Sequence, residues 1–200
     1  MRTGTKLCGA LMMTMLLAAP AFASGEFSLF PAYWNPKASN AIGGGGVQFG
    51  WDFTPTFGME VRGTYFKEMT NDPLRAAFHS DDPVFRDKGI RVRPVEAGLK
   101  LRFGENPMFR PYVGGGVSYF FLDSDLGNIK DETGWYGELG TDIGHLHNTN
   151  FFAEALWRSA EATVNIASLD RVDLADTARV NLDGFGANVG VRWHFGSDND

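Results

Sequence analysis

The sequence predicts an all-β fold, an eight-stranded antiparallel up-and-down transmembrane β-barrel. Three observations lead to this prediction. Apolar and polar residues alternate with a period of two over most of the chain, which is typical of strands with one apolar and one polar face. Tight turns alternate with long polar loops between these strands. Aromatic residues gather near the strand ends, as they do where a barrel meets the two surfaces of a membrane.

The N-terminus has the pattern of a cleaved secretory signal peptide, which we expect to cover residues 1–23. Arg2 and Lys6 precede an apolar run, and the small-residue pattern Ala21-Phe22-Ala23 stands just before the expected cleavage point. We therefore expect one mature domain, residues 24–200. The only cysteine, Cys8, lies within the signal peptide, so neither a disulfide nor a thiolate metal site is expected after cleavage.

The chain is acidic, with 18 Lys and Arg against 24 Asp and Glu and a net charge of −6. Loss of Arg2 and Lys6 with the signal peptide leaves 16 basic residues against 24 acidic ones, a net charge of −8. An exported acidic protein is a poor binder of nucleic acid, so no nucleic-acid partner is expected. No segment after the signal peptide reaches the roughly 18 consecutive apolar residues of a membrane helix.

Eight segments carry the alternation. In the last one, FGANVGVRWHF, Phe, Ala, Val and Trp alternate with Gly, Asn, Arg and His. The expected strands cover residues 26–34, 43–53, 57–67, 90–103, 109–122, 133–145, 150–162 and 183–196. Tight turns lie at 54–56, 105–108 and 146–149, and longer connections lie at 35–42, 68–89, 123–132 and 163–182. Short turns at one end and long loops at the other are typical of barrels that span a membrane.

The polar faces of these strands carry charges of both signs, and we expect them to point into the barrel. The expected lumen-facing network is Asp52, Glu60, Arg62, Glu96, Lys100, Arg102, Glu138, Asp142, Glu154, Arg158 and Arg192. Its six acids and five bases nearly balance, as buried ion pairs require. Because a barrel of about eight strands is just wide enough for side chains to fill it, the sequence predicts a salt-bridged plug.

A soluble barrel or sandwich with its apolar face inward is the alternative fold. The aromatic residues favour the membrane barrel, because a water-soluble core has no reason to sort aromatic side chains to two rims. The aromatics expected at the membrane interfaces are Phe53, Phe57, Tyr65, Phe103, Phe109, Tyr119, Trp135, Phe151, Trp157 and Phe195.

Runs of glycine interrupt two strands, in IGGGGVQFGWDF (42–53) and PYVGGGVSYFF (111–121). Glycine inside a strand often marks a close approach by another group. In the second run the alternation places Gly114 and Gly116 toward the lumen and Gly115 toward lipid. We expect the inward glycines to leave room for large charged neighbours, and Gly115 to ease the coiling of a small barrel.

With its signal peptide, eight alternating strands, PYVGGGVSYFF after a tight turn and GVRWHF near the end, the chain resembles the small outer-membrane β-barrel superfamily of Gram-negative bacteria. This group includes OmpA-like, OmpX-like, OmpW-like and opacity-type porin family proteins. The resemblance implies that residues 24–200 form an outer-membrane β-barrel domain. It also implies contact with outer-membrane lipids, including lipopolysaccharide, and with the barrel assembly machinery during biogenesis. One departure is that the terminal aromatic of these proteins is usually the last residue, whereas Phe195 is followed by GSDND.

The function expected is that of an integral outer-membrane protein with a charge-filled lumen, either structural or in surface interaction through long extracellular loops. The surface ligand is not identified. Apolar residues within 163–182, namely Val164, Ile166, Leu169, Val172 and Leu174, suggest that strands continue above the membrane there.

A narrow small-solute channel or porin is the alternative function. A lipid A-modifying enzyme is a third, but no serine follows His145 or His147 at the spacing that such barrels use. We therefore expect no catalytic residue, no metal site and no cofactor.

Overall fold

A computed structural model describes residues 24–37, 39–67, 69–70, 89–104, 106, 108–124, 128–146, 148–165 and 177–196. The signal peptide expected at residues 1–23 lies outside these ranges. Within them, all regular elements are β-strands. The same ranges contain no helix of the length and apolar character needed to cross a bilayer.

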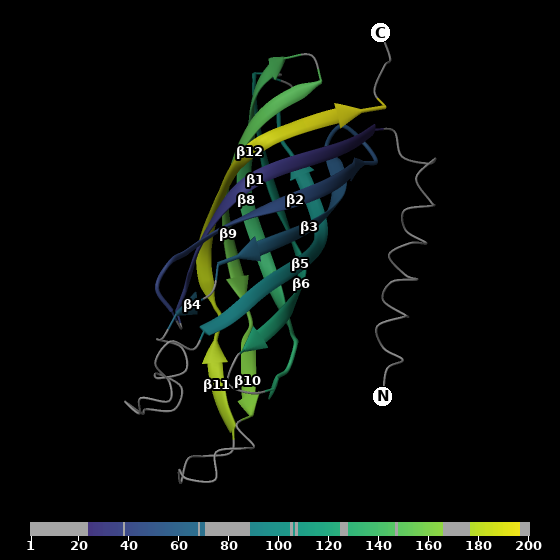
Figure 1. The fold of residues 1–200 in the computed structure, drawn as a ribbon. Helices are drawn as coiled ribbons and strands as arrows, with labels where there is room; N and C mark the ends of the chain where they lie inside the picture. Colours follow the sequence, from purple (N-terminus) through teal and green to yellow (C-terminus); the bar gives the residue numbers. More distant parts are fainter. Residues whose placement is uncertain are drawn as a thin grey trace.

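Eight long strands build a closed barrel (Figure 1). They are β1 (Ser24–Pro36), β2 (Ile42–Asp52), β3 (Phe57–Phe66), β5 (Gly89–Arg102), β6 (Phe109–Ser124), β8 (Glu132–Leu146), β9 (Thr149–Ser159) and β12 (Gly184–Phe195). Each strand pairs antiparallel with the next along the chain, β1 pairs with β12, and β3 pairs with β5 across the intervening segment. The predicted eight-stranded antiparallel up-and-down barrel is confirmed, and the predicted strand bounds agree to within three residues.

The tight turns are stabilised locally. Thr54 Oγ1 accepts hydrogen bonds from the backbone N–H groups of Thr56 (3.3 Å) and Phe57 (2.9 Å), which closes the turn between β2 and β3. Between β8 and β9 the register shifts after Ile143, and Gly144 has a φ of 79°. This left-handed conformation suits glycine and marks a β-bulge at the end of the ladder.

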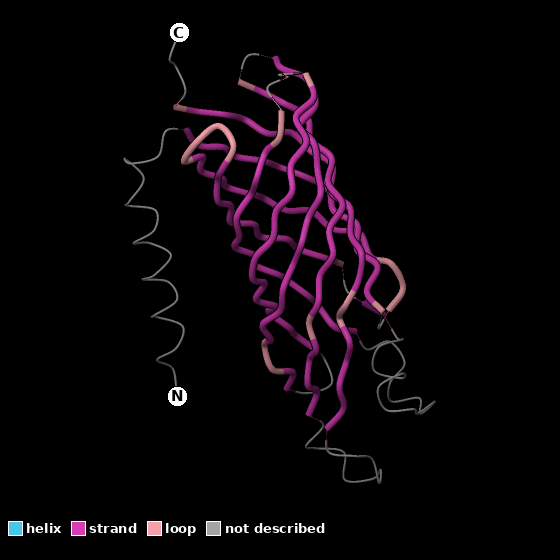
Figure 2. Tube along the Cα trace, turned by 180° about the vertical axis from the view of Figure 1, so that it is seen from behind, coloured by secondary structure: helices cyan, strands magenta, loops and turns pink. Residues whose placement is uncertain are grey.

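Short strands extend the barrel at the end away from these turns. A three-stranded sheet in the order β11-β10-β7 is formed by β10 (Glu161–Asn165), β11 (Thr177–Asn181) and β7 (Asn128–Ile129), and β4 (Met69–Thr70) pairs with β5. Figure 1 shows β10 and β11 projecting beyond the barrel, and Figure 2 shows the loops confined to its two ends. The predicted continuation of the strands is confirmed for Val164, which lies in β10. The other apolar residues of that prediction, Ile166, Leu169, Val172 and Leu174, lie outside the described residues.

Side chains alternate between the lumen and the outer surface. In β5, Glu96 and Lys100 are almost fully buried, whereas Leu99 and Leu101 are exposed. The same alternation places polar side chains inside and apolar ones outside over the half of the barrel that carries the tight turns. A soluble protein buries its apolar face instead, so the soluble alternative is not what the structure shows.

Glycines provide the space for large inward side chains. Gly50 lies opposite Glu26, Gly46 opposite Phe30, and Gly140 opposite Tyr112. A Cβ atom at Gly140 would come within 2.6 Å of the Tyr112 ring. The missing side chain therefore lets the neighbouring one lie across the strand.

The glycine run in β6 is close-packed on both faces. A Cβ at Gly114 would lie 2.6 Å from Glu138 Oε1, in the lumen. A Cβ at Gly115, on the outer face, would lie 2.9 Å from the backbone oxygen of Tyr136. The sequence therefore predicted the inward packing at Gly114 but not the backbone contact at Gly115.

Gly140→Ala is expected to destabilise the barrel by about 1–3 kcal/mol, because the new methyl group displaces the Tyr112 ring. Gly137→Ala on the same strand is the matched control, since its Cβ would meet only Gly114 O at 4.0 Å. The measurement is the urea midpoint of the folded protein in detergent micelles, followed by tryptophan fluorescence. Equal midpoints for the two variants would contradict the proposed packing of Tyr112 against Gly140.

Candidate functional site: the barrel interior

Arg62 is the centre of an ion-pair network in the lumen. Its Nη2 lies 2.5 Å from Glu138 Oε2, 3.1 Å from Glu60 Oε1 and 3.1 Å from Glu154 Oε1. Its Nη1 lies 3.7 Å from Glu96 Oε2. All five side chains are fully buried. One guanidinium thus serves four carboxylates, which it can do because its donors spread in a plane.

Further ion pairs run across the lumen between strands that are not neighbours in the sheet. Arg158 on β9 donates from Nε and Nη2 to the two oxygens of Glu96 on β5, at 2.8 and 2.9 Å. Arg192 on β12 donates from Nη1 to Asp142 on β8. Because such bonds connect strands that are not adjacent in the sheet, they fill the lumen and resist a change in its cross-section.

The half of the lumen near the tight turns holds a second group of charges. Arg102 Nη2 lies 2.6 Å from Glu26 Oε2, and Arg102 Nη1 pairs with Asp52. Lys100 Nζ lies 2.7 Å from Glu60 Oε2 and 3.5 Å from Glu26 Oε1. Lys100 and Glu60 connect this group to the network around Arg62.

Neutral donors complete the coordination of the carboxylates. Tyr112 Oη donates to Glu154 Oε2 at 2.8 Å, and Asn188 Nδ2 donates to Glu154 Oε1 at 2.8 Å. Tyr136 Oη donates to Glu60 Oε1 at 2.9 Å. These bonds matter because a buried carboxylate needs partners for its remaining lone pairs.

The structure places all eleven residues of the predicted network on the inner face. Ten are no more than 6% exposed, and the Asp52 side chain is 17% exposed. Glu26 on β1 joins the network as well, which raises the carboxylates to seven against five bases. The prediction did not include Glu26, although Glu26 and Ser28 alternate with Phe27 and Leu29 at the start of β1.

The lumen is not charged along its whole length, which corrects the prediction of a charge-filled interior. Toward the long-loop end, Trp34 packs on Phe66 and Phe120 with ring centroids 5.2 and 6.1 Å apart. Arg158 lies over the Phe66 and Trp34 rings at 5.6 and 5.9 Å, where the charged and apolar parts meet. The apolar part, which we call the aromatic cap, comprises Phe30, Ala32, Trp34, Ile42, Phe66, Ile90, Val92, Phe120, Leu122, Ala160, Val180 and Leu182. Phe152 contacts the cap through Phe30, at 6.1 Å between ring centroids, but pairs in register with Asp142 nearer the tight turns.

The aromatics predicted for the membrane interfaces point outward. Nine of the ten are exposed, and Phe57 is partly covered by its contact with Phe53, at 5.5 Å between ring centroids. The nine exposed ones are Phe53, Tyr65, Phe103, Phe109, Tyr119, Trp135, Phe151, Trp157 and Phe195. Further outward aromatics are Tyr33, Phe49, Phe121, Phe185 and Trp193.

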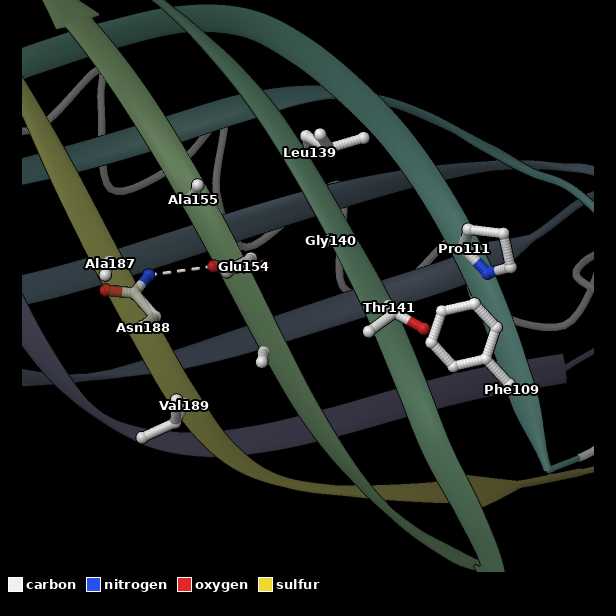
Figure 3. Close-up of a pocket in the computed structure, with 11 residues that line it drawn as sticks. Phe109, Pro111, Leu139, Gly140, Thr141, Glu154, Ala155, Ala187, Asn188 and Val189 are labelled. Atoms are coloured by element: carbon white, nitrogen blue, oxygen red, sulfur yellow. Dashed lines mark hydrogen bonds between the residues drawn. The ribbon is translucent and has the colours of Figure 1, made fainter.

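A hollow of about 470 Å³ lies against the wall formed by β6, β8, β9 and β12. Figure 3 shows its lining, with Asn188 directing its amide toward Glu154 on the next strand. Most of the lining is apolar and belongs to the outward set, including Leu139, Ala155 and Val189. The hollow is therefore a shallow depression in the outer wall.

Two further kinds of site were considered for the sequence, a metal site and a lipid-modifying site with His145 and His147. Among the described residues, no group of three or more His, Cys, Asp or Glu side chains could hold a metal ion. Of the two histidines considered for a lipid-modifying site, His147 lies outside the described residues.

Comparison with known proteins identifies the fold. No protein-family model matches the chain, and no curated protein matches its sequence. Solved structures do match. The outer membrane protein OprG from Pseudomonas aeruginosa superposes with a TM-score of 0.65 at 16% identity, over 88% of this chain and 97% of OprG.

Two further structures show the same likeness. Neisserial surface protein A has a TM-score of 0.56 at 14% identity, over 86% of this chain and 96% of its own. Outer membrane protein W from E. coli has a TM-score of 0.52 at 18% identity, over 86% and 98%. The chain therefore has the fold of the small eight-stranded outer-membrane barrels.

Arg62→Met is expected to destabilise the barrel by about 3–5 kcal/mol, because it leaves four buried carboxylates without their common cation. Glu138→Gln is expected to cost much less, since it removes one carboxylate from a set in acid excess and its Oε1 makes no hydrogen bond. Urea unfolding of both variants in the same micelles provides the comparison. A larger loss for Glu138→Gln than for Arg62→Met would show that Arg62 is not the centre of the network.

Proposed function

We propose that the chain is an integral protein of the bacterial outer membrane whose filled barrel serves as a rigid scaffold for contacts at the cell surface. The observation that carries this proposal is the arrangement of the two faces, with an apolar belt outside and a lumen closed by charges and aromatic rings inside. The likeness to OprG and the other outer-membrane barrels supports it.

The outer belt supports membrane insertion. Leu139, Val189 and Trp135 are 62%, 55% and 69% exposed, and many other large apolar side chains share this surface. A continuous apolar surface of this kind drives aggregation in water but suits a bilayer. Aromatic side chains near the strand ends match the two interfaces of a membrane, and the tight turns then face the periplasm.

The filled lumen favours a structural role over a channel. Ion pairs such as Arg62–Glu138 and Arg158–Glu96 connect facing walls, and Trp34, 0% exposed, packs within the aromatic cap. A solute could pass only if these contacts broke. Removing one partner of a buried ion pair costs about 3–5 kcal/mol.

The β10–β11 extension supports surface contact. It continues the hairpin of β9 and β12 above the belt, and Leu182 N–H bonds to Ala160 O at 2.9 Å at its base. The paired strands extend the wall of the barrel beyond the belt and so add surface for contact there. We infer that such contact, and not catalysis, is the activity of the protein, with outer-membrane lipids and the assembly machinery as its partners in the envelope.

Purified protein is expected to migrate faster unboiled than boiled on a detergent gel and to give no stepwise conductance in planar bilayers. The first result follows from a barrel that stays folded in detergent, and the second from the closed lumen. Identical mobility before and after boiling contradicts the membrane barrel. Stepwise conductance supports a narrow small-solute channel instead.

Replacing residues 161–181 by a two-residue turn is expected to leave the heat-dependent gel shift intact and to reduce attachment of expressing cells to cell monolayers and to glass. The hydrogen bond between Leu182 and Ala160 marks where the shortened hairpin closes. Replacing Thr54-Pro55-Thr56 at the opposite end is the control. Unchanged attachment of the shortened protein would argue against a role in surface contact.

A further inference from the structure

The carboxylates around Arg62 outnumber the cations that face them. Glu60, Glu138 and Glu154 each have one oxygen within 3.1 Å of Arg62 Nη2. This nitrogen carries two hydrogen atoms, so it cannot donate a bond to all three oxygens. Lys100 is the second cation of the group, with Nζ 2.7 Å from Glu60 Oε2. Three carboxylates therefore face two cations, and full ionisation leaves one negative charge uncompensated.

The other arginines of the lumen do not supply the missing positive charge, because each has carboxylates of its own. Across the whole lumen, seven carboxylates face five bases. The remaining pairs are Arg158–Glu96, Arg102–Glu26, Arg102–Asp52 and Arg192–Asp142.

Hydrogen bonds stabilise the ionised forms of Glu60 and Glu154. Glu60 accepts bonds from Tyr136 Oη at 2.9 Å and from Gln48 Nε2 at 2.6 Å. Glu154 accepts bonds from a tyrosine hydroxyl and an asparagine amide, both at 2.8 Å. Donors that point at a carboxylate favour its charged form. These two glutamates are therefore the ones that hold the negative charges.

Glu138 is the least well partnered of the three. Its Oε2 accepts one hydrogen bond, from Arg62 Nη2 at 2.5 Å. Its Oε1 has no hydrogen-bond partner among the described residues, and Lys100 Nζ is 4.0 Å away, beyond hydrogen-bond distance. The side chain is 0% exposed, so water does not solvate this oxygen. A buried charge without partners is costly, and a proton on the bare oxygen removes it.

The groups that face Glu138 leave the carboxylates as the only acceptors of a proton near neutral pH. As ordinary side chains, tyrosines are neutral there, and arginine and lysine are already charged. The charged and titratable groups around Glu138 are Glu60 and Arg62 on β3, Lys100 on β5, Tyr112 on β6, Glu154 on β9 and Tyr136 on β8 itself.

We propose that Glu138 carries a proton on Oε1 at neutral pH and that this proton holds the ion-pair network of the lumen together. With the proton in place, Glu60 and Glu154 face Arg62 and Lys100, two charges against two. Loss of the proton at higher pH places a third negative charge between the other two, and their repulsion loosens the network. The proposal rests on the closed lumen of the proposed function and makes that closure pH-dependent.

Infrared spectroscopy tests the proton directly, because the carbonyl stretch of a protonated carboxyl is separate from that of a carboxylate. The mature protein, folded at pH 7 in a detergent without carbonyl groups, is expected to show this band. Glu138→Gln is expected to lose intensity in the band. Asp142→Asn is the matched control on the same inner face of β8, and it is expected to keep the band because Asp142 is paired with Arg192.

The pH dependence of unfolding provides a second readout. A glutamate in the unfolded chain has a pKa of about 4.3, so at neutral pH the folded chain holds one proton more than the unfolded chain. Stability therefore falls as the pH rises, and the unfolding equilibrium constant rises about tenfold per pH unit while the folded chain keeps the proton. Glu138→Gln is expected to lack this dependence when urea unfolding is followed in micelles from about pH 6 to pH 8.

Four results would overturn the proposal. They are the absence of the carboxyl band from the unaltered protein, an undiminished band in Glu138→Gln, the same pH dependence of unfolding in both proteins, and failure of Glu138→Gln to fold. The last result counts because an amide of the same shape replaces a neutral carboxyl. Conductance at pH 7 overturns the closed lumen instead, whereas a protein that does not conduct and lacks the band overturns only the proton on Glu138.

Discussion

The shared coordination of four glutamates by Arg62 is the interaction on which the interior depends. A lumen of eight strands leaves little room for water, so each carboxylate inside it must find its partners among side chains. Arg62 can satisfy several at once because they arrive from different strands around the wall. The same demand explains the glycines, since Gly140 and Gly114 leave space for Tyr112 and Glu138.

The side chains that fill the interior change along the barrel, from charged ones near the tight turns to apolar ones near the long loops. Near the tight turns, the ion pairs of Arg102 and Arg192 hold the walls together. Near the long loops, Trp34, Phe66 and Phe120 fill the lumen with apolar volume. Arg158 joins the two parts, with Glu96 on one side and the Phe66 ring on the other. The charged part stabilises the cross-section of the barrel through ion pairs, and the apolar part does so through close packing.

The outer surface obeys a separate set of constraints on the same strands. Side chains on this surface contact the surroundings of the barrel. On β5 these are Leu99 and Leu101 along the belt and Arg93 nearer the long loops. Its inner face carries Lys100 and Glu96. Two environments are thus encoded in one strand by alternate residues, which is why a slip of one position would invert both faces.

The sequence by itself determined the barrel, its strand bounds and the inward direction of the eleven charged residues, because each follows from a period of two that is local in the chain. It did not reveal the role of Glu26 or the aromatic cap. At the far ends of β1, β3 and β6 both faces are apolar, so alternation carries no information there. Which charges meet was also decided only by the closed structure. Arg62 and Glu138 are separated by 76 positions, and only the curvature of the sheet brings them to 2.5 Å.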